Sequence, residues 1–207
     1  MTTDSDSRTY RKAERARREQ ETRLRITEAA VELHRTVGPA NTTVTDVAKL
    51  AGVSRMTVYN HFPTDVDLFV ACSTHWASQN PFPDPAQWET MGDPRERLAS
   101  ALQELYRWYR LKEEMLAKVF RDTPVVPSLA QVMGSLWGPY EDALVQTLAA
   151  GWSANGAEVE VPDDTELAAV LRLVLDFNTW RSLTGSGLDH ESAAGLAARM
   201  VFGAAGT

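Results

Sequence analysis

Apolar residues recur at three- and four-residue steps along most of the chain, which is the period of an amphipathic α-helix. The first such segment ends at Gly38-Pro39, because glycine suits a left-handed cap and proline cannot continue a helix. Its apolar face consists of Ile26, Ala29, Ala30, Leu33 and Val37. No segment shows the two-residue alternation of a strand, so the pattern predicts an all-α fold.

Three helix starts follow in close succession after Pro39. Thr43 to Asp46 has the pattern of a capping box opening a short helix, which Gly52 ends. Ser54 can cap a second short helix that runs to about Phe62. Thr64 to Asp67 resembles another N-terminal box, this time for a longer helix. The sequence therefore predicts two short helices joined by a turn, with a longer helix on either side.

Helical spacing resumes at Asp93-Pro94, where a capping residue precedes a proline that can occupy the first helical position. The pattern predicts one helix from there through Trp108, a separate shorter helix over about 113–121, and a five-turn helix from Ser128. A loop is expected over 151–162.

Two last helices are expected over about 163–183 and 190–203. Within the first of them, residues 167–177 contain nine apolar residues of eleven. A helix that is apolar all round must be covered on all sides, either within one chain or partly by a second copy.

Composition excludes several classes of protein. The chain has 207 residues, 43% of them hydrophobic, which is enough to bury a core. It contains no apolar run of the ~20 residues that a membrane-spanning helix needs, and its polar N-terminus has no secretory signal pattern. Its single cysteine, Cys72, fits a reducing compartment, so a cytoplasmic protein without membrane partners is expected.

Charge is distributed unevenly along the chain. The formal net charge of −7 is the sum of +3 over residues 1–62 (11 Lys and Arg against 8 Asp and Glu) and −10 over 63–207 (10 against 20). Residues 8–25 alone carry eight basic groups and three Glu, a net of +5. This asymmetry is typical of a protein of which one part binds a polyanion such as DNA. A charged helix that is merely solvated would give the same asymmetry.

The stretch Thr42 to Phe62 is the most informative one. Two short helices joined at Gly52-Val53 form a helix-turn-helix, whose second helix can lie in the major groove of DNA. Arginine suits the guanine edge, asparagine the adenine edge, and Thr or Tyr hydroxyls suit phosphates. An ordinary helical hairpin with a polar outer face is the alternative. The outward residues of the second helix are Arg55, Met56, Thr57, Tyr59, Asn60 and His61.

These residues resemble the TetR family of bacterial transcriptional regulators. The resemblance covers about residues 20–80 and lies in TVTDVAKLAGVS, TVYNHFPT and the start of the next helix at Asp67-Leu68-Phe69. It implies a homodimer, a three-helix DNA-binding domain over 20–80, and a helical effector-binding and dimerisation domain over 81–207. It also implies phosphate contacts near Thr43 and Tyr59, and base reading by some of Arg55, Met56, Thr57, Asn60 and His61.

Two positions depart from the family pattern. Met56 stands where many members have a small residue, and Asp65 stands where many have a lysine near a phosphate. The basic N-terminal arm expected over residues 1–19, with the cations that continue to residue 25, can compensate for the lost contact, and such arms can enter the minor groove.

The C-terminal part is rich in aromatic residues, each of which alone is better explained as core. Together they can line an apolar pocket for an effector of unknown identity, and the acidity of this part favours a cationic lipophile over a fatty acyl group. The expected pocket residues are Trp108, Tyr109, Met133, Trp137, Tyr140 and Phe177. The last two helices resemble the family's dimerisation pair.

The sequence thus predicts a ligand-responsive homodimeric repressor that binds a near-palindromic double-stranded operator. A helical small-molecule-binding or protein-interaction module with an unused DNA-binding head is the alternative. An enzyme is disfavoured: the four histidines are scattered, no G-x-S-x-G, P-loop or G-x-G-x-x-G occurs, and Cys72 lies in an apolar run. No catalytic residue, metal site or cofactor is expected.

Overall fold

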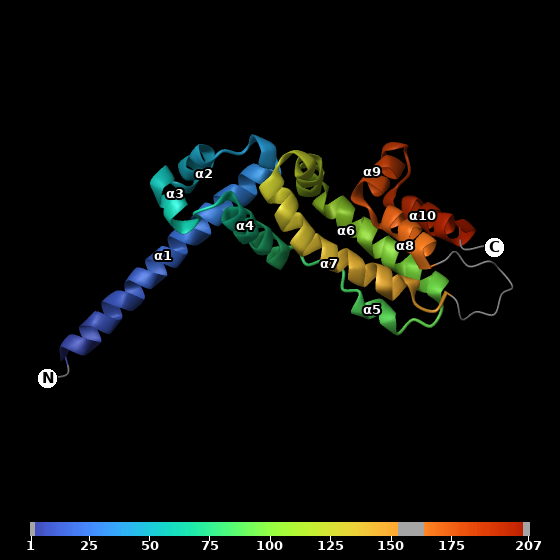
Figure 1. Ribbon diagram of the computed structural model, residues 1–207, viewed down its shortest axis with the longest axis horizontal. Helices are drawn as coiled ribbons and strands as arrows, with labels where there is room; N and C mark the ends of the chain where they lie inside the picture. Colours follow the sequence, from blue (N-terminus) through green and yellow to red (C-terminus); the bar gives the residue numbers. More distant parts are fainter. Residues whose placement is uncertain (1–2, 153–163, 205–207) are drawn as a thin grey trace. The chain divides into compact units, whose positions relative to one another are not determined.

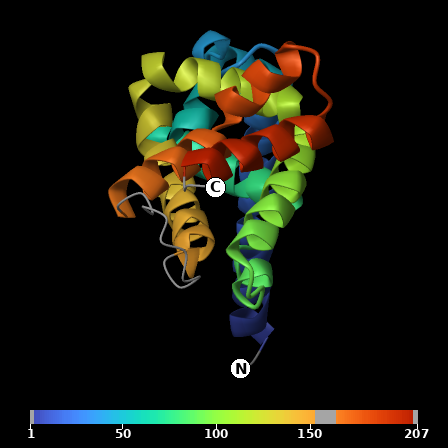
Figure 2. The same ribbon diagram turned by 90° about the vertical axis from the view of Figure 1, so that its right-hand side faces the viewer.

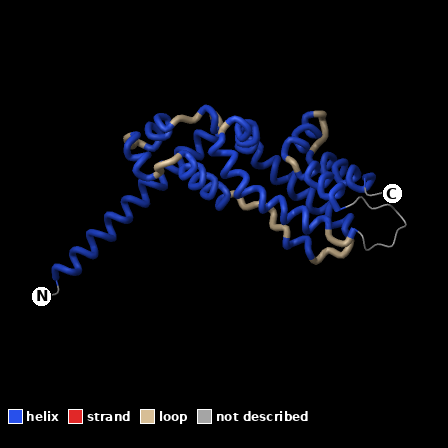
Figure 3. Tube along the Cα trace, viewed as in Figure 1, coloured by secondary structure: helices blue, strands red, loops and turns tan. Residues whose placement is uncertain are grey.

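The computed structural model describes residues 3–152 and 164–204, and this part of the chain is helical, without strands (Figure 1 and Figure 3). The all-α prediction is confirmed. Two compact units are present: Met1–Asn80 with Arg121–Val132, and Pro81–Phe120 with Met133–Thr207. Residues 121–132, which the sequence assigned to the C-terminal domain, therefore pack with the first unit. No described helix is long and apolar enough to cross a membrane.

The first unit is built on one long helix. It contains α1 (Thr3–Thr36), the 3-10 turn η1 (Pro39–Asn41), α2 (Val44–Ala51), α3 (Arg55–His61), α4 (Asp65–Gln79) and a second 3-10 turn, η2 (Thr123–Val125). Helix α1 packs against α2 and α4, and α2 packs against α3. The buried apolar side chains include Ile26, Ala30, Val47, Ala48, Val58, Phe62, Leu68 and Phe69.

Helix α1 is continuous through the segment in which the sequence suggested an arm. It begins at Thr3 and shows no break near residue 19 or 20. The expected arm over 1–19 is therefore helical from Thr3 and is continuous with the helix that packs in the domain. The predicted stop is confirmed: α1 ends at Thr36, and Gly38 has a positive φ of 93° before Pro39.

The second unit contains α5 (Ala86–Glu89), α6 (Pro94–Asp122), α7 (Pro127–Ala149), α8 (Asp164–Leu175), α9 (Phe177–Gly185) and α10 (His190–Ala204). The last two residues of α6 and the residues of α7 up to Val132 belong to the first unit. Helix α10 packs against α8 and α9 (Figure 1 and Figure 2). The expectation of two helices before Asp122 is wrong, because α6 runs unbroken past the exposed Leu111. Most of the loop predicted over 151–162 lies outside the described residues.

The helix expected over 163–183 is interrupted. Helix α8 ends at Leu175, and Asp176 adopts an extended backbone and caps α9, its side chain accepting from the amides of Asn178 and Thr179. Buried tyrosines of α6 satisfy two carbonyls at the end of α8: Tyr106 donates to Val174 at 2.8 Å and Tyr109 donates to Leu175 at 2.6 Å. Hydrogen bonds from buried tyrosines thus stabilise the break between α8 and α9.

Candidate nucleic-acid interface

A tight turn joins α2 and α3. Gly52 adopts the left-handed conformation with φ 67° that favours glycine, and the amide of Val53 donates to the carbonyl of Ala48 at 3.0 Å. Ser54 then caps α3 by accepting from the amide of Thr57 at 3.0 Å. At the start of α2, Thr43 caps in the same way, accepting from the amide of Asp46 at 3.2 Å. The predicted helix-turn-helix is present with its caps.

The middle and the C-terminal end of α3 are held against the rest of the first unit. Val58 and Phe62 are buried in the core of the first unit. Arg23 of α1 donates from Nη1 to the carbonyl of His61 at 2.6 Å, and its guanidinium lies 4.1 Å from the centroid of the Phe62 ring. Sequence reasoning counted Arg23 only as one of the basic groups, because nothing in helical spacing distinguishes a cation that holds a neighbouring helix.

The side chains of α3 that are predicted to contact DNA differ in their exposure to solvent. Met56 is 67% exposed, and Asn60, one turn later, is exposed beside it. Arg55 and Tyr59 are also exposed and lie along one flank of α3.

The other flank of α3 is less accessible. Thr57 is half-buried and its hydroxyl lies 2.9 Å from that of Ser54. His61 is half-buried too, with its ring centroid 6.5 Å from that of Phe62. Four of the six side chains predicted to face DNA are therefore exposed, and only Thr57 and His61 are partly covered.

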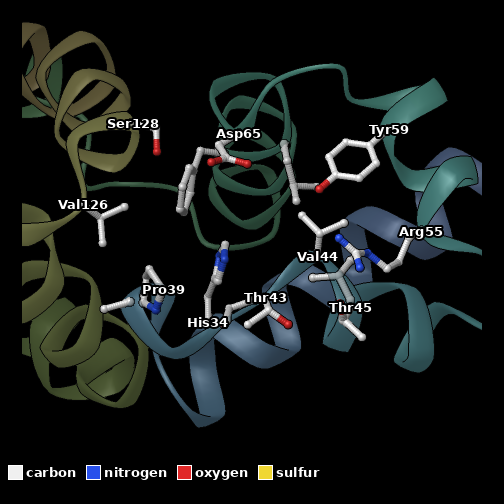
Figure 4. Close-up of a pocket in the computed structure, with 15 residues that line it drawn as sticks. His34, Pro39, Thr43, Val44, Thr45, Arg55, Tyr59, Asp65, Val126 and Ser128 are labelled. Carbon is white, nitrogen blue, oxygen red and sulfur yellow. The ribbon is translucent and has the colours of Figure 1, made fainter.

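Three predicted DNA contacts gather around a cavity of about 460 Å³ in the first unit. Thr43, Arg55 and Tyr59 line it, together with Thr45 and Asp65. Figure 4 shows Arg55 and Tyr59 on one side of this cavity. Thr45, exposed in the first turn of α2, is a contact candidate that sequence reasoning missed, since its position beside Arg55 depends on the packing of α2 on α3.

A buried histidine lies at the inner side of this cavity. His34 stacks on Phe69 with ring centroids 5.1 Å apart, and its Nδ1 is 3.5 Å from Sγ of Cys72. Burial lowers the pKa of His34 to about 4, although Asp122 opposes the shift, so the ring is neutral near pH 7. Burial raises the pKa of Cys72 to about 12. The expectation that Cys72 is a buried structural thiol agrees with this environment.

The end of α6 is tied to the turn after α1. The buried carboxylate of Asp122 accepts from the amide of Ala40 at 2.9 Å and pairs with Arg121 at 2.6 Å. Hydrogen bonding to the Arg121 guanidinium holds the pKa of Asp122 below its usual value. The short segment 121–132 therefore joins the DNA-binding unit through a charge-assisted bond.

The aromatic residues expected to form an effector pocket lie together in the second unit. Ring centroids are 5.8 Å apart for Trp108 and Tyr109, 6.3 Å for Tyr109 and Trp137, 5.4 Å for Trp137 and Tyr140, and 5.3 Å for Tyr109 and Phe177. The sixth candidate, Met133, is half-buried one turn before Trp137. The structure thus brings these five rings, from α6, α7 and α9, into one cluster.

Three further rings belong to this cluster and were not among the candidates. Phe82 lies 4.8 Å from Tyr140 and 5.0 Å from Trp108, measured between centroids. Phe120 lies 5.5 Å from Trp137, and Trp180 lies 5.3 Å from Phe177. Phe82 precedes α5 in a turn-rich segment, where no periodicity signals that a ring points inward. Among the described residues, the buried indole N–H of Trp180 has no hydrogen-bond acceptor.

A helix-turn-helix with a fastened second helix and exposed Arg, Tyr and Asn side chains defines a DNA-binding protein of the helix-turn-helix class. Within the described residues, no group of three or more His, Cys, Asp or Glu side chains is placed to hold a metal ion.

Comparison with known families assigns the N-terminal unit. Residues 26–72 match the family profile described as "Bacterial regulatory proteins, tetR family". Residues 26–72 are therefore of the type found at the N-terminus of TetR-family regulators. Comparison with curated protein sequences gives no match.

Solved structures share the fold over most of the chain. FadR from Bacillus subtilis, in complex with stearoyl-CoA, has a TM-score of 0.63 at 18% identity, over 87% of this chain and 98% of that one. NalD from Pseudomonas aeruginosa, described as the secondary repressor of the MexAB-OprM multidrug efflux pump, has a TM-score of 0.59 at 18% identity, over 90% and 96%.

A third structure holds a small cation. A regulator from Saccharomonospora viridis in complex with choline has a TM-score of 0.54 at 18% identity, over 89% of this chain and 95% of that one. At these identities the similarity establishes the fold and leaves the ligand of this chain to be argued from its own residues.

Proposed function

We propose that the protein is a homodimeric repressor that binds a near-palindromic operator through α3 and releases it when a small molecule binds the second unit. The observation that carries the proposal is the exposed Arg55, Met56, Tyr59 and Asn60 on a helix held by the Ser54 cap and by Arg23. The description of NalD as a repressor supports the direction of control. The coupling requires a differential affinity of only about 1–3 kcal/mol.

Operator binding is tested by selecting binding sequences from a randomised duplex library and footprinting the selected duplex. A two-fold-symmetric protected site is expected. Arg55→Ala should weaken binding to this duplex by about 10- to 100-fold, the cost of one bidentate base contact, with little change on random DNA. Arg107→Ala, which removes an exposed cation of α6, is the matched control.

Equal binding of operator and random DNA across a salt series would refute this function. That result would favour the alternative of a helical binding module with an unused DNA-binding head. The carboxylate of Asp65 beside the predicted phosphate contacts is the feature that such a module would explain.

For the effector, we propose a cationic lipophile bound by the aromatic cluster. Phe82, Trp137 and Tyr140 are only half-buried, so part of each ring is open to a ligand, and aromatic rings attract cations. Burial raises the pKa of the Tyr140 hydroxyl, and the nearby carboxylates of Glu104 and Asp84 add to this rise; two acidic groups near Tyr140 favour a cationic ligand. The regulator crystallised with choline supports a cation, whereas the FadR complex with stearoyl-CoA represents the acyl alternative.

Calorimetric titration with tetraphenylphosphonium, choline and palmitate distinguishes these ligands. We expect tetraphenylphosphonium to bind most tightly and to release the selected operator duplex. Trp137→Leu should weaken its binding about five-fold or more, because a cation–π contact away from water is worth about 1–2 kcal/mol. Trp76→Leu, in the first unit, is the control. Tighter binding of palmitate would overturn the proposed ligand class.

For the dimer, we propose that α8 and α10 provide the contact between subunits. These helices pack on each other, and each leaves an apolar side chain exposed: Leu173 is 52% exposed and Met200 is 40% exposed. Leu173→Glu should therefore shift the sedimenting species from dimer to monomer. Leu111→Glu is the matched control, because Leu111 is 59% exposed on α6. A Leu173→Glu protein that remains dimeric would exclude this surface.

A further inference from the structure

Helix α1 extends well beyond the domain that it supports. Its packed part begins near Arg23 and Ile26, whereas the described side chains from Arg8 to Thr22 are exposed or half-buried. Figure 1 shows this N-terminal stretch continuing past α3. At ~1.5 Å per residue, the fifteen steps from Arg8 to Arg23 span about 22 Å. This length corresponds to about six base pairs of DNA, at ~3.4 Å per step.

The direction in which this stretch points follows from helix geometry. About eighteen residues make five full turns of an α-helix, so residues eighteen apart share one face. Arg8, Arg11, Lys12 and Arg15 therefore lie on the same face of α1 as, in order, Ile26, Ala29, Ala30 and Leu33. The part of this face from Ile26 to Leu33 packs against α2 and α4. The four cations thus continue the face of α1 on which the helix-turn-helix sits.

Three of these four cations are available for a partner. Among the described side chains, Arg8, Lys12 and Arg15 are exposed and form no ion pair, and Glu19 is the acid that shares their face. The carboxylates of Glu14 and Glu21 are instead occupied by Arg17 and Arg18, at distances of 2.7–3.0 Å. These pairs, spaced three or four residues apart, help to keep the stretch helical before any partner binds.

The composition of the stretch selects the kind of partner. Between Arg8 and Arg25 its apolar residues are Tyr10, Ala13, Ala16 and Leu24, which do not form the repeating seam that a coiled-coil partner requires. A face of cations with few apolar neighbours matches a polyanion. The helix is also about 10 Å wide, and the minor groove is about 6 Å wide, so this stretch cannot enter that groove as an extended arm does.

We propose that residues 8–22 of α1 form a second DNA-contacting element, which lies along the phosphate backbone outside the bases read by α3. This inference rests on the proposed operator binding and extends it to the flanking duplex. Arg8, Lys12 and Arg15 neutralise phosphates there and carry no sequence information. The element also adds backbone affinity to a helix-turn-helix that has the carboxylate of Asp65 at its edge.

The test compares full-length proteins on two duplexes. One duplex ends at the operator core selected with the wild-type protein, and the other adds about ten base pairs on each side, somewhat more than the reach of the helix. Affinity is measured across a salt series, because each released phosphate contact changes the slope of log K against log salt by about 0.9. The variant Arg8→Gln/Lys12→Gln/Arg15→Gln is matched in charge by Arg35→Gln/Arg107→Gln/Arg110→Gln, in which all three cations lie outside the proposed element.

On the long duplex, we expect the first triple variant to lower the slope by about 2–3 and to lose backbone protection in the flanks. On the core duplex, it should bind like the wild type. The charge-matched variant should bind like the wild type on both duplexes, apart from a small long-range effect.

Three results would overturn the inference, and they can be told apart. Wild-type protein that binds the core duplex but gains nothing from the flanks refutes the second element and leaves operator binding intact. Wild-type protein that selects no operator refutes the proposed function, and this inference with it. If the two triple variants gave equal slopes of log K against log salt, DNA affinity would depend on net charge alone and not on the face of α1 that carries the cations.

Discussion

Arg97 offers a sharp test of how the second unit is held together. It is a buried arginine, 5% exposed, near the start of α6. Nη1 donates to the carbonyl of Thr147 at 2.9 Å and to that of Ala150 at 2.6 Å, and Nη2 donates to the carbonyl of Met91 at 2.6 Å. Carbonyls at the end of a helix have no partner within it, so this guanidinium caps the end of α7.

The expected cost of removing this group follows from those contacts. Arg97→Met keeps the length and apolar stem of the side chain but leaves three carbonyls without their donor. A hydrogen bond from a charged donor contributes about 1.5–3 kcal/mol, and relief of the buried charge offsets part of the summed loss. We expect a net loss of about 3 kcal/mol. At about 2–4 °C per kcal/mol for a chain of this size, the melting temperature should fall by about 6–12 °C.

Thermal unfolding followed by circular dichroism, at one protein concentration for all variants, measures this loss. Arg107→Met is the control, since it removes an exposed arginine from the same helix and should stay within about 0.5 kcal/mol of the wild type. Arg97→Lys should be intermediate, because an ammonium group cannot reach the three carbonyls with a planar fork. An Arg97→Met protein that melts at or above the wild-type temperature would show that burying the charge costs more than its hydrogen bonds return.

Three other groups give further predictions. Tyr109→Phe should destabilise the protein by about 1–2 kcal/mol, because the carbonyl of Leu175 loses its buried donor; an unchanged melting temperature would contradict the role given to this bond at the break before α9. The pKa of His34 is lowered to about 4 in the folded protein, so the unfolded chain takes up the proton first and stability should fall as pH drops from about 6.5 towards 4, by at most about 3 kcal/mol. His34→Gln should flatten the dependence of the urea midpoint on pH over that range, and an unaltered dependence would assign it to other groups. Cys72, whose pKa is raised to about 12 by burial, should resist a disulfide reagent at neutral pH until guanidinium chloride unfolds the protein; rapid native-state labelling would show that the thiol is reached from solvent.

Local chemistry was sufficient to predict the helix-turn-helix. Thr43 and Ser54 have side chains that cap helices, and Gly52 tolerates the positive φ of the turn. These effects act over three or four residues, so they can be deduced from neighbouring letters. The outward position of Met56 and Asn60 follows equally from the 3.6-residue period of a helix whose Val58 is apolar. Helix starts at Thr64 and Pro94 were predictable for the same reason.

Contacts between distant residues could not be predicted in this way. Arg23 and Arg8 are the same residue type in one helix, yet only Arg23 meets the carbonyl of His61, because α3 packs beside it. The break of the helix at Asp176 was not predicted, because the residues around it are almost all apolar and suggest one continuous helix. The break depends on tyrosines of α6 that donate hydrogen bonds to the last carbonyls of α8.

The amino-acid sequence by itself determined the helical class, the helix-turn-helix and the sign of charge along α1, because periodicity, capping and charge are properties of short segments. The tertiary structure decided which aromatic rings meet. Phe82 joins Trp108 and Tyr140 across more than twenty residues of sequence. It also decided which buried charges, such as Arg97, hold two helices together. These features depend on the packing of whole helices, and packing brings together residues whose separation in sequence carries no periodic signal.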